Sequence, residues 1–422
     1  GSSNTAVGRT ALYSNTTASN NTAMGRQAAY SNTTGTELTA IGKGALYTNS
    51  TGNYNTAVGY QTMRYNTTGS DNTAYGDEAL RSNTSGGKNT VSGNIALYAN
   101  TTGSNNVAFG MQALRFNTTS SDNVAVGYQT LYSMSSTGDA NKSTAVGYQA
   151  GYNSTHNVDA FGAQALYNNT TGVLSVAIGR EALYSNTGAS YNTAVGYQAG
   201  YSNTTGGENS YFGRFSGKGV TTGTGNVFLG ARAGNYQIPT TTGSYNTVIG
   251  SYSKVGNGGD SNAVAIGHNI VGTSGFTTLG DAANDIRAAH GNVTWNTVSD
   301  QRYKKDIVDS TAGLSFVNAL QPRTFKYKTL GELPETFNAY EADSTEVFKN
   351  SVTNHGFIAQ EVKAAIDAHP ELKDGFAMWG ERPDGGQEIG EAALIPMLVK
   401  AVQELSATND ALVARITALE GA

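Results

Sequence analysis

The 422-residue chain contains no cysteine, which excludes disulfides, thiolate metal sites and a cysteine nucleophile. Charge is also scarce: 14% of the residues are charged and the net charge is −5, so no nucleic-acid partner is predicted. No apolar run approaches the ~20 residues that span a bilayer, and therefore no membrane insertion is predicted. The five histidines are scattered without ligand spacing, so neither a metal nor a cofactor is expected.

The few charges are distributed unevenly along the chain. From Ser299 onward, 31 of 124 residues are charged, whereas the 298 residues before it contain 26 charged residues and 44 of the 53 glycines. Only the C-terminal part has the charge content of an ordinary globular domain. We therefore predict a repeat region over residues 1–267, a junction over 268–298 and a separate domain over 299–422.

Glycine recurs every 17 residues between Gly8 and Gly127, and the step is mostly 17 afterwards. A triplet such as Thr-Ala-Val precedes the glycine, and a second apolar residue such as Leu12 or Leu46 follows four positions later. One unit is too small to bury a core, but stacked units would align like residues. The pattern predicts a mainly β fold, a parallel β-roll or β-solenoid of 17-residue repeats. A disordered spacer, the alternative, would not keep this phase.

Two polar or aromatic columns share the repeat phase. The asparagines at Asn15, Asn32, Asn49, Asn66, Asn83, Asn100 and Asn117 precede Thr or Ser, and we expect them to form turns and a ladder of stacked amides. Tyrosine recurs at Tyr13, Tyr30, Tyr47, Tyr98, Tyr132, Tyr152, Tyr167, Tyr184 and Tyr201. This column is interpreted as packing between chains, with a sugar-stacking surface as the alternative.

The unit Ser175-Val176-Ala177-Ile178-Gly179-Arg180-Glu181-Ala182-Leu183 resembles the head repeat of trimeric autotransporter adhesins. The resemblance extends over roughly residues 4–280 and implies that three chains wrap together into an adhesive fibre. An ice-binding solenoid is the alternative from a different class. It would need an unbroken threonine face, which is interrupted at Val107, Val124, Asp159 and Val176.

The stretch Val298-Ser299-Asp300-Gln301-Arg302-Tyr303-Lys304-Lys305-Asp306-Ile307 resembles the start of the endosialidase-type intramolecular chaperone. That domain is a self-cleaving serine peptidase at the C-termini of phage tail spikes and fibres. Further matching motifs are Leu320-Gln321-Pro322, Phe325-Lys326-Tyr327 and Gly356-Phe357-Ile358-Ala359-Gln360-Glu361-Val362, followed by a C-terminal helix. The resemblance implies a small α+β chaperone domain.

A serine becomes a nucleophile only when a base takes its proton, and the nearest candidates to Ser299 are Lys304 and Lys305. The resemblance assigns Ser299 as nucleophile and Lys304 as general base, with cleavage of the Val298–Ser299 bond in cis. Asp300 is expected to orient the scissile turn. In the alternative, Ser299 and Asp300 cap a helix that begins near Gln301. A chaperone that does not cleave is a third possibility. If the chain does cleave, the expected enzymatic activity is a single autoproteolytic turnover in cis.

The chain ends in a heptad pattern over 394–420, which predicts a coiled-coil helix. The trimerisation seam comprises Ile395, Leu398, Val402, Leu405, Asn409, Leu412, Ile416 and Leu419. Asn409 would fix the register at a cost in stability. The alternative is an amphipathic helix packed on its own domain.

These features together predict a homotrimeric extracellular fibre, either a bacterial cell-surface adhesin or a virion tail fibre or spike. Its C-terminal domain would drive trimerisation and folding, because parallel β-coils pair slowly and expose edges while they fold. The predicted external partner is a surface glycan or another cell-surface receptor, contacted by loops outside the repeat.

Overall fold

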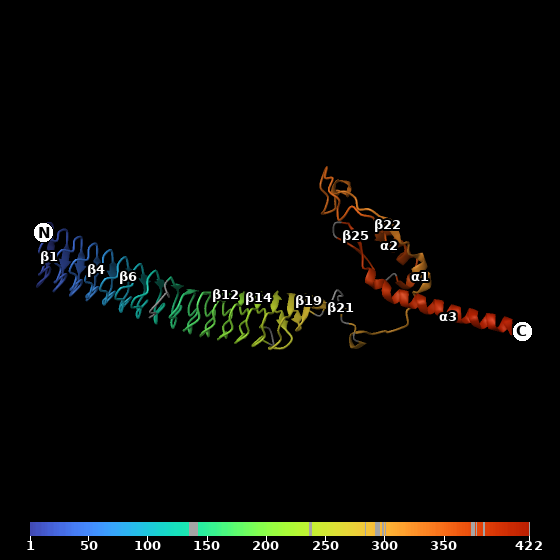
Figure 1. The fold of residues 1–422 in the computed structure, drawn as a ribbon, viewed down its shortest axis with the longest axis horizontal. Helices are drawn as coiled ribbons and strands as arrows, with labels where there is room; N and C mark the ends of the chain where they lie inside the picture. Colours follow the sequence, from blue (N-terminus) through green and yellow to red (C-terminus); the bar gives the residue numbers. More distant parts are fainter. Residues whose placement is uncertain are drawn as a thin grey trace. The chain divides into compact units, whose positions relative to one another are not determined.

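The computed structural model describes residues 1–134, 142–235, 239–282, 284–291, 296–297, 299, 301–372, 376, 378–382 and 385–421. Contacts divide the chain into two compact units, Gly1–Ser299 and Asp300–Ala422. The first unit is the parallel β-solenoid that the repeat predicts (Figure 1).

Each regular coil of the solenoid contributes one short strand, which pairs in register with the strand of the next coil. Thr5 pairs with Thr22, for example, and Ala6 pairs with Ala23. The strands are β1 (Thr5–Val7), β2 (Thr22–Met24), β3 (Thr39–Ile41), β4 (Thr56–Val58), β5 (Thr73–Tyr75), β6 (Thr90–Ser92), β7 (Val107–Phe109), β8 (Val124–Val126), β9 (Thr144–Val146), β10 (Val158–Phe161), β11 (Ser175–Ile178), β12 (Thr193–Val195), β13 (Ser210–Phe212), β14 (Val227–Leu229) and β15 (Thr247–Ile249).

The parallel ladder continues beyond β15 through β17 (Val264–His268), at the end of the predicted repeat region, and through β19 (Phe276–Asp281), which lies inside the stretch expected to be a junction. Alongside it, β16 (Lys254–Val255) pairs with β18 (Val271–Gly272). The chain then reverses, because β20 (Asn284–Ala289) runs antiparallel to β19 and is followed by β21 (Asn296–Thr297). The reversal covers the edge of the last coil, which would otherwise be open to pairing with another strand.

Alternation along each triplet decides which residue faces the core. The middle residue points inward: Ala23, Ala40 and Ala57 are fully buried. The residue before the glycine points outward, as Ile41 does with 37% of its surface exposed. The prediction that equivalent residues of successive coils stack on one another is confirmed. The core, however, is formed by the middle alanine of the triplet and by the apolar residue four positions after the glycine, and not by the residue before the glycine.

The repeat glycines are required by the close approach of successive coils. Gly25 has φ 135°, and a Cβ atom added there would lie 2.6 Å from the carbonyl oxygen of Gly42 in the next coil. Any side chain would thus be strained by the backbone and would also collide with it. Glycine therefore recurs about every 17 residues because one backbone passes directly over the next at each of these positions.

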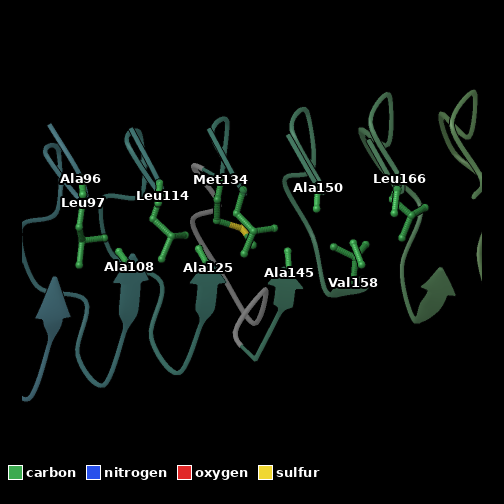
Figure 2. Packing of buried hydrophobic residues seen from close by; sticks show 14 of the residues in the cluster. Ala96, Leu97, Ala108, Leu114, Ala125, Met134, Ala145, Ala150, Val158 and Leu166 are labelled. Carbon is green, nitrogen blue, oxygen red and sulfur yellow. The ribbon is translucent and has the colours of Figure 1, made fainter. Parts of the chain in front are cut away.

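The core of the solenoid is a column of leucines opposite a column of alanines, shown for part of the chain in Figure 2. Leu97 and Leu114, which have φ values of 48° and 51°, turn inward from the coil and are fully buried. They face the strand residues Ala108 and Ala125. Large and small side chains thus face one another across a narrow, closely packed interior.

The core volume is conserved where the strand residue becomes large. Tyr211 and Phe228 replace the inward alanine, and the residue four after the repeat glycine is then Gly200, Gly217 or Gly234 in place of leucine. A Cβ atom on Gly217 would lie 2.3 Å from the Tyr211 ring. Burial also raises the pKa of the Tyr211 phenol well above its ordinary value. Exchanging large and small residues across the coil keeps its cross-section constant.

The predicted asparagine ladder is confirmed. The Nδ2 group of Asn49 donates to Oδ1 of Asn32 at 2.9 Å, and Asn66 donates to Asn49 at 2.8 Å. Asn49 also donates to the carbonyl of Gly52 within its own turn. Each buried amide thus bonds to its own turn and to the next coil, which satisfies groups that are costly to bury unpaired.

A second asparagine ladder, which the sequence did not predict, runs along the start of the strands. Asn72 donates from its backbone N–H, at 3.0 Å, and from its side chain, at 3.2 Å, to Oδ1 of Asn55. Asn89 and Asn106 repeat the arrangement in the following coils. Asn55 and Asn66, one from each ladder, both donate to the carbonyl of Gly69, so the two ladders run side by side and fasten successive coils together.

The tyrosine column stacks within the single chain. Neighbouring rings lie 4.8–5.2 Å apart and within 9° of parallel, for example Tyr13 on Tyr30 and Tyr167 on Tyr184. Where arginine takes the place of tyrosine, Arg81 donates to the Tyr98 hydroxyl at 2.8 Å. Because the ring faces cover one another, they are not free to stack on a sugar, and the packing they provide joins successive coils.

The second unit is a small α+β domain. Its helices are α1 (Leu314–Ala319), α2 (Ala359–Asp367) and α3 (Ile395–Glu420), and its short 3₁₀ helices are η1 (Gln301–Tyr303), η2 (Leu330–Glu332), η3 (Pro370–Leu372) and η4 (Glu391–Leu394). Two antiparallel pairs complete it, β22 (Arg323–Phe325) with β23 (Asn354–Gly356) and β24 (Trp379–Glu381) with β25 (Gln387–Ile389). Phe316, Val362, Met378 and Leu394 form the centre of its core.

Candidate functional site

The predicted nucleophile and base lie on either side of one helical turn. Ser299 is exposed, η1 follows from Gln301, and Lys304 is exposed directly after it. The backbone N–H of Lys304 donates to the carbonyl of Gln301 at 3.0 Å. A helical turn therefore begins where the capping alternative placed one. Val298 and Asp300 lie outside the described residues.

A serine–lysine pair acts on a peptide bond only when the amine is neutral, which requires a site sheltered from water. In the single chain both Ser299 and Lys304 are open to solvent. The assignment of nucleophile and base therefore stays a prediction, and it requires a further surface to cover this segment.

An apolar surface that the sequence analysis missed follows directly after the lysines. Residues 304–311 are exposed without regular secondary structure, and 62% of Ile307 and 86% of Val308 are accessible. Two neighbouring β-branched side chains on an exposed segment are unfavourable in water. In the sequence, the only sign of this surface is a pair of apolar residues, Ile307 and Val308, between Asp306 and Asp309. That pattern is too short to predict an exposed apolar surface.

The predicted seam residues all lie on α3, and all are exposed. The most accessible apolar ones are Ile395, Val402 and Leu419, with 60%, 64% and 72% of their surface exposed. Asn409 is exposed in the same row. Of the described α3 residues, the two that are buried are Met397 and Ala401, which lie outside the predicted seam. The helix thus packs on its own domain with one face and presents the seam on another.

The C-terminal half of α3 differs from the first half, because residues 405–421 are exposed on every side. This segment holds Leu405, Leu412, Ile416 and Leu419. Isolated helices of that length are marginal in water, and most helical stability comes from burying an apolar face. The exposure therefore indicates a helix that needs a partner, rather than one packed along its own domain.

Glu404 joins the start of this segment to the body of the domain, a contact that sequence reasoning missed. Its Oε2 accepts a hydrogen bond from the backbone N–H of Leu314 at 2.7 Å. A carboxylate at the first turn of α1 satisfies a free N–H and meets the positive end of the helix dipole. The orientation of α3 is thus tied to α1, although 90 residues separate the two in sequence.

Two further polar contacts join α2 to its neighbours in the domain. Arg323 on β22 donates two hydrogen bonds to Glu361 on α2, at 2.8 and 3.0 Å. These bonds lower the pKa of the Glu361 carboxyl. His369 contacts the Ala365 carbonyl through Nδ1 and the Ser315 hydroxyl through Nε2, which links α2 to α1. Both contacts stabilise the platform from which α3 projects.

No metal-binding group of three or more His, Cys, Asp or Glu side chains occurs among the residues that the structure describes. Within the same part of the chain, no helix combines the length and apolar character needed to cross a bilayer.

Comparison with known protein families gives a match to the C-terminal unit. Residues 299–370 match the family Peptidase_S74, described as "Chaperone of endosialidase". The match begins at Ser299 and ends at the start of η3, so it contains α1 and α2 and leaves α3 outside. Neither the search of curated proteins nor that of solved structures found a protein similar to this chain.

Proposed function

From the chaperone-of-endosialidase domain that this chain carries at its C-terminus, we propose that three identical chains form a surface fibre and that this domain assembles it. The observation that carries the proposal is the terminal helix, whose heptad of apolar side chains is exposed and whose residues 405–421 are exposed on every side. Three such helices would bury their seams against one another.

Assembly from the C-terminus addresses a kinetic difficulty of the solenoid. Its parallel strands are two to six residues long and pair across coils, so each coil forms only by closing a loop on its neighbour. A module that first brings three chains into register supplies a fixed end from which coils can form in order. Partly folded coils with open edges then persist for less time.

Autocleavage at Val298–Ser299 is the second part of the proposal. Trimerisation would bring exposed surfaces of neighbouring domains together and provide the shelter from water that Ser299 and Lys304 require. Cleavage would then release the chaperone after the solenoid is complete, and assembly would become irreversible. In the alternative, the chaperone remains attached and only aligns the chains.

The fibre is proposed to act outside the cell by contacting a surface glycan or another receptor. Three exposed tyrosines, Tyr54, Tyr191 and Tyr245, lie at one repeat position outside the stacked column, so their rings are accessible. In the coils that follow Tyr54, the same repeat position is occupied by Asp71, Lys88 and Asn105, which line a polar hollow of about 400 Å³ with neighbouring serines. Accessible aromatic rings beside hydroxyl and amide groups suit a carbohydrate.

Sedimentation equilibrium of the full chain tests the proposed assembly. We expect the mass of three chains across a wide range of loading concentrations. If the chain cleaves, the expected mass is instead that of three solenoid fragments. A single-chain mass at micromolar concentration would contradict the proposal, whichever form is present.

A further inference from the structure

One outward column of the solenoid carries large apolar side chains along its whole length. The residue before each repeat glycine is 36–53% exposed at Val7, Met24, Ile41, Tyr75, Phe109, Val126, Val146, Phe161, Ile178, Phe212, Leu229 and Ile266. No charged residue occurs at this position of any coil. We call this column the apolar stripe.

The stripe is larger than the exposed apolar surface of an ordinary monomer. With strands ~4.8 Å apart, it extends over roughly 75 Å. Its exposed side chains amount to an area on the order of 1,000 Å², whereas the largest apolar patch of a typical monomer is about 300–600 Å². A stable interface buries about 800 Å² per partner. The stripe by itself is therefore large enough to hold a permanent interface.

Side-chain size along the stripe varies as it does in a packed interior. The one small polar residue, Ser92, lies between Tyr75 and Phe109, and parallel pairing places the three in adjacent layers. On a solvated surface this order has no packing reason. Around a shared axis, three tyrosines and three phenylalanines in alternate layers would overfill the space unless the layer between them were small.

We propose that the apolar stripe faces the axis of the fibre and packs against the stripes of two further copies of this chain. This inference rests on the proposed trimer and adds which face of the solenoid forms the contact. Only another copy, aligned coil for coil, carries the same order of large and small residues over the same length. The polar turns then lie outward, where a receptor can reach them.

Site-directed disulfide formation tests this placement, because the chain has no cysteine of its own. Val126→Cys on β8 introduces one thiol into the stripe. Thr102→Cys introduces one into an exposed turn and is the matched control. A disulfide requires Cα atoms about 4.4–6.8 Å apart, so it forms at a shared axis and not between turns that point outward.

With oxidised glutathione as the oxidant, we expect over half of the Val126→Cys chains to migrate as disulfide-linked pairs on a non-reducing gel. The third chain of each trimer has no thiol left to pair with. The Thr102→Cys chains should stay almost entirely single. Sedimentation of both reduced variants gives the oligomeric state independently.

A trimer without the Val126→Cys disulfide, or with equal disulfide formation by the control, would overturn the stripe proposal without contradicting the proposed trimer. A single-chain mass would overturn the trimer itself.

Discussion

Replacing Leu405 and Leu412 together with aspartate is expected to abolish the three-chain species. Both leucines are half exposed in the single chain, at 52% and 53%, and both lie in the seam. Burying a leucine contributes roughly 1.5–3 kcal/mol, and a trimer would bury six of them. Six carboxylates in the same layers would repel one another in a dry environment. We expect at least a hundredfold less trimer by sedimentation, together with loss of the soluble, folded solenoid.

The control for this experiment is Ala407→Asp with Ala414→Asp. Both alanines are exposed on α3 and lie opposite the seam. The control adds the same charge to the same helix and loses at least as much helix propensity, because alanine is a better helix former than leucine. It should leave the trimer intact. Equal damage by both pairs of substitutions would show that the helix needs low charge rather than a seam, and it would contradict the proposed coiled coil.

Ser299→Ala is expected to leave the chain at full length, while the wild-type chain separates into residues 1–298 and 299–422. Without the hydroxyl there is no nucleophile, so cleavage should fall by at least about a thousandfold. Lys304→Gln should have the same effect, because an amide cannot take the serine proton. A denaturing gel with intact-mass measurement gives the fragments directly.

The neighbouring Lys305 offers a matched control for the proposed base. Lys305→Gln removes the same charge one residue away and should still cleave. Loss of cleavage in Lys305→Gln and its retention in Lys304→Gln would assign the base to Lys305. A wild-type chain that stays at full length after trimerisation would favour the alternative in which the chaperone remains attached.

The solenoid was predictable because a repeat glycine reports backbone geometry directly. Gly25 and Gly42 stand where one coil crosses the next, and no other residue fits there. The inward and outward faces of the triplet were not predictable from composition, since Ala40 and Ile41 are both apolar. A three-residue strand is too short for its alternation to show which face is exposed to solvent. The apolar stripe could therefore be recognised only in the structure.

Polar contacts between coils were predictable in part. The ladder through Asn32 and Asn49 was predictable because each asparagine precedes Thr or Ser in a recognisable turn. Asn55 and Asn72 directly precede a strand triplet, and nothing in that position distinguishes them from the rest of the strand motif. In the C-terminal unit, the heptad predicted a helix, and α3 begins and ends within one residue of the expected bounds. The bond from Leu314 to Glu404 depends on tertiary folding and leaves no local pattern.

The central claim is that three chains meet before the solenoid forms, and the concentration dependence of refolding tests it most directly. The Ser299→Ala chain is suited to this measurement, because its solenoid and chaperone stay covalently joined. After dilution from denaturant, the β-sheet circular dichroism signal should recover faster as chain concentration rises. A recovery rate that is the same over a hundredfold range of concentration would show that each solenoid folds alone, and it would contradict the claim.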